Sequence, residues 1–227
     1  MIEKIELEKY RCFRNSKMAI RNLSIIVGKN NSGKSSFIEA LRIIAMATKK
    51  CTNTLYTYPP ESLGLPRYIK GFRLQVDRLK IDLRSIIYYY SADVAKIIAT
   101  FDDKNKIIIY LNDKIAFATI LDKENKLVTS RSKAITLNIK AISILPQIGL
   151  IKENEKLLTE NTITGDMDTY LSSRHFRNEM LLFKKEFFSK FKEVAENTWP
   201  GLRIRNIEYD STMSDYISLF IECDRVR

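Results

Sequence analysis

The chain has 227 residues, 45% hydrophobic and 29% charged, which is typical of a globular protein with its own core. No apolar run approaches the ~18 residues of a membrane span, and the charged N-terminus is unlike a signal peptide, so we expect a cytoplasmic protein. The three cysteines, Cys12, Cys51 and Cys223, are far apart, and His175 is the only histidine. These counts exclude a disulfide scaffold and a zinc module.

The net charge of +11 is unevenly distributed along the chain. Residues 1–50 contribute +7 and residues 51–150 contribute +6, whereas residues 151–227 contribute −2. A polyanionic ligand is therefore expected in the first two thirds of the chain. Charge alone does not distinguish a nucleotide, a nucleic acid and an ordinary soluble basic surface.

The first fifty residues read as strands followed by a helix. Residues 2–9 alternate apolar and charged side chains, as a half-buried strand does, and Lys17–Arg21 is a second strand candidate. The apolar run Leu23–Val27 predicts a strand buried on both faces. Lys34–Lys49 has apolar residues at helical spacing, and the proline-rich Thr52–Pro66 is expected to be a loop.

The middle of the chain, between Leu79 and Lys140, consists of short β-prone runs separated by polar turns. Asp102–Asn105 and Asp122–Asn125 have turn chemistry, so a meander of antiparallel strands is expected. The predicted strands are Lys80–Leu83, Ile97–Phe101, Ile107–Leu111, Ile115–Leu121 and Ala134–Ile144.

The remaining chain is predicted to be helical after Pro146, and Trp199–Gly201 ends the helical pattern. Two closing strands, Leu202–Glu208 and Tyr216–Glu222, follow. A stripe with three- and four-residue spacing predicts a helix face turned to the core, formed by Phe176, Met180, Phe183, Phe187, Phe191 and Val194. We therefore divide the chain into 1–50, 51–145, 146–201 and 202–227.

The segment Gly28–Ser35 (GKNNSGKS) matches the phosphate-loop pattern G-x-x-x-x-G-K-[ST], after a predicted strand and before a predicted helix. Its two glycines allow successive backbone N–H groups to point at one anion, and the helix start adds a positive dipole end. Lys34 is expected at the β- and γ-phosphates, Ser35 at Mg²⁺ and Ser36 at the α-phosphate. The predicted ligands are ATP and Mg²⁺, and the predicted binding residues are Gly28, Asn30, Asn31, Ser32, Gly33, Lys34, Ser35 and Ser36.

The form G-x-N-x-S-G-K-S and the upstream corner Lys9–Arg14 resemble the ATP-binding heads of the SMC, RecF and OLD-family ATPases of the ABC superclass. The resemblance implies an α/β P-loop core with an antiparallel β-layer and a helical lobe. It also implies that Arg11, or less directly Arg14, approaches the nucleotide. An ordinary turn arginine is the alternative for Arg11.

A second resemblance lies at Ile142–Ile151, where a predicted strand ends in Pro-Gln, as the Q-loop of the same superclass does. It implies that Gln147 reaches Mg²⁺ and the attacking water, so that Lys34 and Gln147 are the catalytic residues and Ser35 and Gln147 the metal ligands. An amide suits this role because its oxygen coordinates while its NH₂ donates. A loop glutamine is the alternative.

The segment Leu171–Asn178 also resembles bacterial AAA-type ATPases with SMC-like heads, without an assigned chemistry. Its Arg174, His175 and Arg177 are candidates for contacts with phosphate or DNA. Solvated helix residues are the alternative.

The family's signature loop and Walker B strand have no clear counterpart in the chain. Ile97–Asp103 has the apolar run and the acidic end, but Lys104 and Asn105 make it read as a hairpin turn; Ile217–Asp224 is similar. The resemblance therefore covers the N-terminal lobe of a head. We expect the C-terminal half to be absent from this chain, either by truncation or because another chain supplies it.

The function implied by the resemblance is ATP-Mg²⁺ binding by a head that hydrolyses ATP when two heads dimerise, in bacterial DNA repair or defence against phage. The implied partners are a second head, DNA and an effector such as a nuclease. The alternatives are a nucleotide or small-molecule kinase, which the strand meander disfavours, and a basic nucleic-acid-binding module without catalysis.

Overall fold

The computed structural model describes residues 1–79, 81–90, 94–142, 144, 154–167, 171–209, 211–212 and 215–223. The chain forms two compact units, Met1–Ile144 and Leu145–Arg227. Each unit is considered by itself below. Among the helices described, none has both the length and the apolar character needed to cross a membrane.

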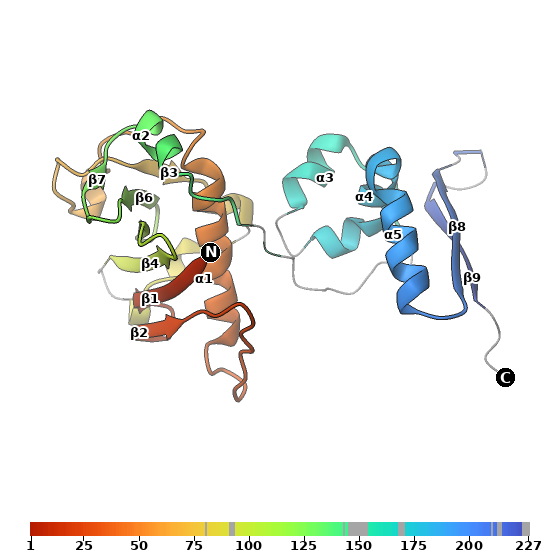
Figure 1. Cartoon of the computed structure of the whole chain (residues 1–227), viewed down its shortest axis with the longest axis horizontal. Helices are drawn as coiled ribbons and strands as arrows, with labels where there is room; N and C mark the ends of the chain where they lie inside the picture. Colours follow the sequence, from red (N-terminus) through yellow and green to blue (C-terminus); the bar gives the residue numbers. More distant parts are fainter. Residues whose placement is uncertain are drawn as a thin grey trace. The chain divides into compact units, whose positions relative to one another are not determined.

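An antiparallel sheet forms the frame of the first unit (Figure 1). Its strands lie in the order β2-β1-β4-β5-β6-β3, and β7 also pairs with β6. The strands are β1 (Ile2–Tyr10), β2 (Phe13–Ala19), β3 (Phe72–Leu74), β4 (Ala95–Phe101), β5 (Lys106–Leu111), β6 (Ala116–Leu121) and β7 (Leu127–Val128). The predicted antiparallel layer is therefore present, and sequence reasoning missed β3 and β7.

Helix α1 (Lys34–Lys50) covers the sheet, and the core lies between them. The alternation in β1 places Ile5 and Leu7 in this core, and α1 contributes Ile43 and Ile44 from its apolar face. All four side chains are fully buried. The apolar residues at two-residue spacing in β1 and at helical spacing in α1 thus pack in the same core, as the sequence pattern predicts.

Two strands predicted in the middle of the chain are not strands. Of Lys80–Leu83, the described part carries no strand, and Leu83 opens the 3₁₀ turn η3 (Leu83–Ser85), because the Asp82 carboxylate accepts a hydrogen bond from the Arg84 N–H. The described residues of Ala134–Ile144 carry no strand either. The first of them belong to helix α2 (Arg131–Thr136), which Ser130 caps by accepting from the Lys133 N–H. Local side-chain caps decided both segments.

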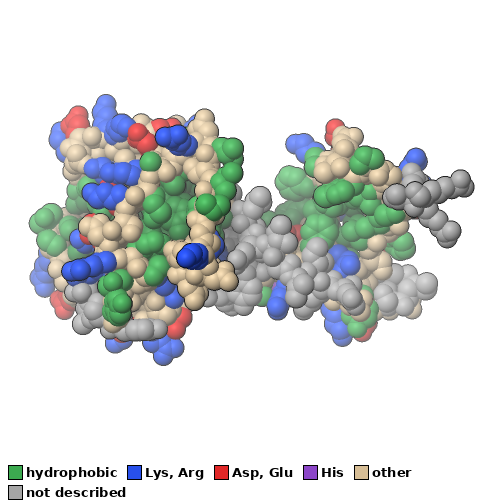
Figure 2. Space-filling model, turned by 90° about the horizontal axis from the view of Figure 1, so that it is seen from below, with side chains coloured by type: hydrophobic (Ala, Val, Ile, Leu, Met, Phe, Trp, Pro, Cys, Tyr) green, Lys and Arg blue, Asp and Glu red, His purple; other side chains and the backbone are tan. Residues whose placement is uncertain are grey.

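The remaining short elements of the first unit are single 3₁₀ turns. They are η1 (Glu61–Leu63), η2 (Val76–Leu79) and η4 (Tyr88–Tyr90). Lys and Arg side chains are spread over the face of this unit in Figure 2, in agreement with its positive charge.

The predicted buried strand Leu23–Val27 is wrong. The segment has no strand structure, and Leu23, Ile25 and Val27 are 81%, 78% and 83% exposed. Figure 1 shows the connection from β2 to α1 running outside the sheet. No described strand lies beside this segment to pair with its backbone, so within the described structure these apolar side chains stay exposed.

The second unit packs short helices with a β-hairpin. The elements are α3 (Glu160–Asp166), η5 (Ser172–His175), α4 (Phe176–Leu182), α5 (Lys184–Thr198), β8 (Leu202–Tyr209) and β9 (Ile217–Cys223). The two closing strands are thus confirmed as an antiparallel hairpin. The phenylalanine stripe is broken at Phe183, which lies outside helical geometry, and Phe187 and Val194 are 51% and 65% exposed. The prediction of a core face is wrong for these last two residues.

Candidate phosphate-binding site

The loop between Val27 and α1 has a glycine at each end, and the conformation of Gly33 favours glycine most clearly. Gly33 has φ of 91°, a left-handed conformation that favours glycine, and a Cβ there would lie 2.7 Å from Cys12 Sγ. A Cβ on Gly28 would lie 2.6 Å from Ser32 Oγ. Between them, Asn31 is left-handed and the Ser32 N–H donates to the Lys29 carbonyl at 3.3 Å. The loop is therefore as tight as the sequence pattern predicts.

Lys34 folds back over this loop. Its Nζ lies 2.7 Å from the carbonyl oxygens of both Gly28 and Lys29. These two bonds fix the ammonium group at the mouth of the loop, where a polyphosphate would meet it. A single positive charge held in this way pairs well with a phosphate oxygen.

The start of α1 is open to an anion. The helix begins after Gly33, whose carbonyl accepts from the Phe37 N–H at 2.9 Å. Its N-terminus carries no side-chain cap, and its first turn has no acidic residue. The first N–H groups of the helix and the positive end of its dipole are thus left for a ligand.

The donor set of the loop fits a magnesium–nucleotide complex. Ser35 is exposed at the first turn of α1 and offers a hydroxyl oxygen, a ligand type that Mg²⁺ accepts. Ser36, half-buried, faces the neighbouring cavity, while Asn30 is exposed in the loop. All eight loop and helix residues predicted from the sequence belong to this one continuous turn.

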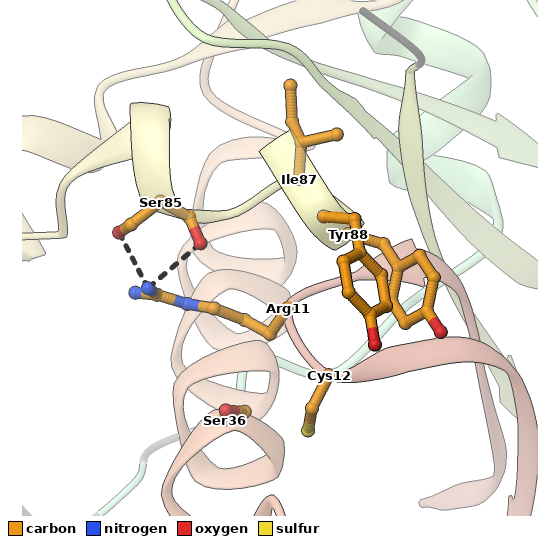
Figure 3. A pocket seen from close by; sticks show the side chains of 7 residues that line it. Arg11, Cys12, Ser36, Ser85, Ile87 and Tyr88 are labelled. Carbon is orange, nitrogen blue, oxygen red and sulfur yellow. Dashed lines mark hydrogen bonds between the residues drawn. The ribbon is translucent and has the colours of Figure 1, made fainter. Parts of the chain in front are cut away.

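Arg11 is held at the corner between β1 and β2, in a left-handed conformation with φ of 52°. Its Nε and Nη2 donate to the two carboxylate oxygens of Glu39 at 2.9 and 2.7 Å. Its Nη1 donates to the carbonyl and hydroxyl oxygens of Ser85 at 3.0 and 2.6 Å, as Figure 3 shows. The corner is thereby fastened to α1 and to η3. Its approach to the nucleotide stays a prediction, as does that of Arg14, which is exposed in β2.

Tyr10 strengthens the same junction. Its hydroxyl donates to Glu39 Oε1 at 2.8 Å, and burial, together with the nearby Glu39 carboxylate, raises the pKa of Tyr10 well above its ordinary value. The phenol is therefore a hydrogen-bond donor at any physiological pH. Glu39 is the only acidic residue of α1, a signal in the sequence that could have identified it.

A cavity of about 420 Å³ opens beside the start of α1 (Figure 3). It joins the β1–β2 corner, the first turn of α1 and the segment from η3 to η4. Its lining residues are Arg11, Cys12, Ser36, Ser85, Ile87, Tyr88 and Tyr89. Sequence reasoning missed all of these except Arg11 and Ser36; the run of three tyrosines at 88–90 was the available signal.

The other predicted residues lie elsewhere. Gln147 falls outside the described residues. In the second unit, His175 Nε2 lies 3.2 Å from Asp166 Oδ2, and the Arg177 N–H donates to the buried Glu155 carboxylate at 2.9 Å. Arg174 is exposed. The Glu155 carboxylate accepts hydrogen bonds from backbone N–H groups at the start of α4. No sequence motif predicted this role.

The two acidic segments considered for a Walker B strand differ from that role. Asp102 binds the N-terminal ammonium group at 2.8 Å, and Asp103 accepts from the Asn105 N–H in the β4–β5 turn. These contacts confirm the predicted hairpin turn. The turn lies beside the first residue of the chain, at the start of β1, whereas Cys12 and the phosphate loop lie at the other end of β1. Glu222 pairs with Arg205 across the β8–β9 hairpin, and Asp224 lies outside the described residues.

Comparison with known proteins shows the family of the chain. The sequence profile described as the AAA ATPase domain matches residues 1–220. The chain belongs to the AAA ATPase domain family. An ATP/GTP phosphatase of Helicobacter pylori is 37% identical over 60 residues, covering 26% of this chain and 16% of that protein. The DNA replication and repair protein RecF of Thermomicrobium roseum is 34% identical over 76 residues, covering 31% of this chain and 19% of RecF.

The family confirms the predicted AAA-type, RecF-like ATPase relationship. ATP binding is a property of the AAA ATPase domain family. The matched stretches span less than a fifth of either relative, and the described structure combines an antiparallel sheet with helices, as predicted.

Proposed function

We propose that this chain binds ATP with Mg²⁺ at Gly28–Ser36, as part of an ATPase head. The backbone N–H groups of the loop and of the first turn of α1 would hold the β- and γ-phosphates, with Lys34 neutralising their charge. Ser35 would hold Mg²⁺, which when bound offsets the charge that develops on the transferred phosphoryl group. Ser36 would contact the α-phosphate.

The observation that supports this proposal most directly is the position of Lys34. Its ammonium group is bound to the carbonyls of Gly28 and Lys29 at 2.7 Å, directly before a helix start that no side chain caps. The ammonium group, the glycine turn and the uncapped start of the helix therefore lie next to one another. Such convergence favours a polyphosphate over a single monovalent anion.

Hydrolysis by this head would require groups beyond the phosphate loop. In-line attack needs a positioned water and a carboxylate in addition to charge neutralisation. We propose that Gln147 positions the water, and that a signature loop and a Walker B carboxylate come from a C-terminal half and a second head. Gln147→Ala should then lower turnover of an assembled head and leave nucleotide affinity nearly unchanged.

For the biological role we propose DNA repair or anti-phage defence, with DNA and an effector such as a nuclease as partners. The support is the RecF relative and the positive charge of the first 150 residues, visible on the first unit in Figure 2. DNA bound by such a surface should dissociate steeply with added salt.

The test is calorimetric titration of ATP-Mg²⁺ into the wild-type chain and into Lys34→Ala. The variant should bind about 1.5–3 kcal/mol more weakly, the scale of a hydrogen bond to a charged group. Lys123→Ala, an exposed lysine in the β6–β7 turn, removes the same charge elsewhere in the unit and should bind like wild type. Equal affinities for wild type and Lys34→Ala would overturn the assignment.

A further inference from the structure

The cavity beside the phosphate loop has polar side chains that are already bound to one another. The Arg11 guanidinium is shared between Glu39 and Ser85, and the Ser85 hydroxyl also donates to the Asp82 carbonyl at 2.8 Å. Ser36, the third residue of α1, also lines the cavity. Among the described lining residues, the side-chain groups left for the edge of a bound base are the hydroxyls of Ser36, Tyr88 and Tyr89 and the thiol of Cys12. A hydroxyl can turn either to donate or to accept a hydrogen bond.

The opposite wall is aromatic. Tyr88 and Tyr89 meet edge to face, with ring centroids 4.5 Å apart and 78° between their planes. Figure 3 shows the Tyr88 ring beside Cys12, across the cavity from Ser36. An aromatic ring next to an open cavity is a stacking surface for a flat ligand.

This wall is rigidly attached to the site. Ile87 pairs with Tyr10 at the end of β1, and the Arg11 N–H donates to the Ile86 carbonyl at 2.5 Å. Tyr89 is nevertheless 81% exposed and has left-handed backbone angles, φ 52° and ψ 29°. A bulky residue held in this conformation at a cavity rim is an outlier of the kind that accompanies binding sites.

From this geometry we infer that the cavity is the nucleobase subsite of the proposed phosphate site, that a purine stacks on Tyr88, and that adenine and guanine are accepted about equally. The inference rests on the proposed function, because the triphosphate must occupy Gly28–Ser36 for its base to reach Tyr88. Stacking accepts any purine, since both have the same aromatic face. Discrimination between adenine and guanine requires edge hydrogen bonds of fixed direction, and the hydroxyls of this lining, which can either donate or accept, impose none.

The first experiment compares ATP, GTP and inorganic tripolyphosphate, each with Mg²⁺, by calorimetric titration of the whole chain. ATP and GTP should bind within about threefold of each other, and about tenfold more tightly than tripolyphosphate. Tyr88→Ala should weaken ATP and GTP five- to tenfold and leave tripolyphosphate unchanged. Tyr88→Phe, which keeps the ring, and Tyr68→Ala, an exposed tyrosine outside the cavity lining, should bind as wild type does.

Three results would overturn the subsite. They are a preference above tenfold for ATP or GTP, equal weakening of ATP and tripolyphosphate in Tyr88→Ala, and an unchanged ATP affinity in that variant. Failure of the proposed function looks different, because then neither ATP nor tripolyphosphate binds in a Lys34-dependent manner.

A second measurement needs no change in the aromatic wall. Cys12 lines the cavity and is exposed, as is Cys223, whereas Cys51 is buried. In a Cys223→Ser background, ATP should slow maleimide labelling of Cys12 at least fivefold more than tripolyphosphate does. Equal protection by the two ligands would place the base elsewhere and overturn the inference.

Discussion

The segments before and after the phosphate loop are both rich in apolar residues, but the first is exposed and the second is buried. Behind the loop, Ile43 and Ile44 of α1 are fully buried against the sheet; before it, Leu23 and Val27 are more than 80% exposed. A helix satisfies its own backbone hydrogen bonds and needs only a surface to cover. A strand also needs a neighbour to pair with, and no described strand lies beside Leu23–Val27.

The phosphate loop is supported by the helix that follows it and by a corner of the sheet. The loop is anchored through α1 and through the β1–β2 corner, where Cys12 and Phe13 touch Gly33 and Arg11 binds Glu39. The preceding segment contributes little to that support within the described structure. The consequences can be measured as differences in stability between the two flanks.

The largest expected difference is between Ile44→Ala and Ile25→Ala. Ile44→Ala removes fully buried methyl groups from the core and should lower the free energy of unfolding by about 2–5 kcal/mol. Ile25 is 78% exposed, so the same substitution there should change it by less than about 0.5 kcal/mol. Urea denaturation followed by circular dichroism measures both. A cost for Ile25→Ala near that of Ile44→Ala would show that the segment is packed in solution.

A second pair of variants isolates the contact between the loop and the corner. Gly33 and Gly64 are both left-handed, with φ of 91° and 60°, but a Cβ on Gly64 would meet nothing within 4 Å. Gly64→Ala should therefore cost only the left-handed strain, about 1–2 kcal/mol. Gly33→Ala adds a clash with Cys12 and Phe13 and should cost about 1–3 kcal/mol more. Equal losses for the two variants, by the same denaturation assay, would remove the corner as a support of the loop.

The ion pair between Arg11 and Glu39 also attaches the β1–β2 corner to α1, and its contribution to stability can be measured. Both side chains are about one-fifth exposed, and Glu39 also accepts from Tyr10. Glu39→Gln should lower the free energy of unfolding by about 1.5–3 kcal/mol, because hydrogen bonds to a charged group are lost. A double-mutant cycle with Arg11→Lys checks the pairing. Additive effects of the two substitutions would contradict a direct coupling.

Much of this architecture followed from the sequence where local signals agreed. The alternation of β1, the helical period of α1 and the phosphate-loop spacing each fix a structure through a few neighbouring residues. The errors have two kinds of cause. Leu23–Val27 lacks a neighbouring strand, which only a distant part of a chain could supply. The other two are local: the helix stripe breaks at Phe183, and Ala134 joins a helix that Ser130 caps. The cavity beside the loop brings together residues 11, 36 and 88, a meeting that periodicity alone could not reveal.

The smallest expected effect concerns the far end of α1, and its sign can be worked out. Burial raises the pKa of Cys51 from 9.0 to about 11, and its thiol donates to the Thr48 carbonyl at 3.1 Å. The folded protein thus keeps a proton that the unfolded chain loses above pH 9. This contribution to stability is complete below pH 9 and is lost as the pH rises through 11, by at most about 1.4 kcal/mol per pH unit.

Cys51→Ala should flatten the decline of stability between pH 9 and 11, whereas Cys12→Ala, at the exposed corner between β1 and β2, should leave it as in the wild type. The measurement is urea denaturation at half-unit steps of pH, comparing the slopes of the three proteins rather than their absolute stabilities, because removal of the buried thiol also alters packing. Since other groups titrate in the same range, only the difference between slopes reports Cys51. Identical slopes for wild type and Cys51→Ala would mean that the thiol at the end of α1 is accessible to water. The end of α1 would then be less buried than its middle, and the difference in burial between this helix and the exposed segment Leu23–Val27 would be smaller.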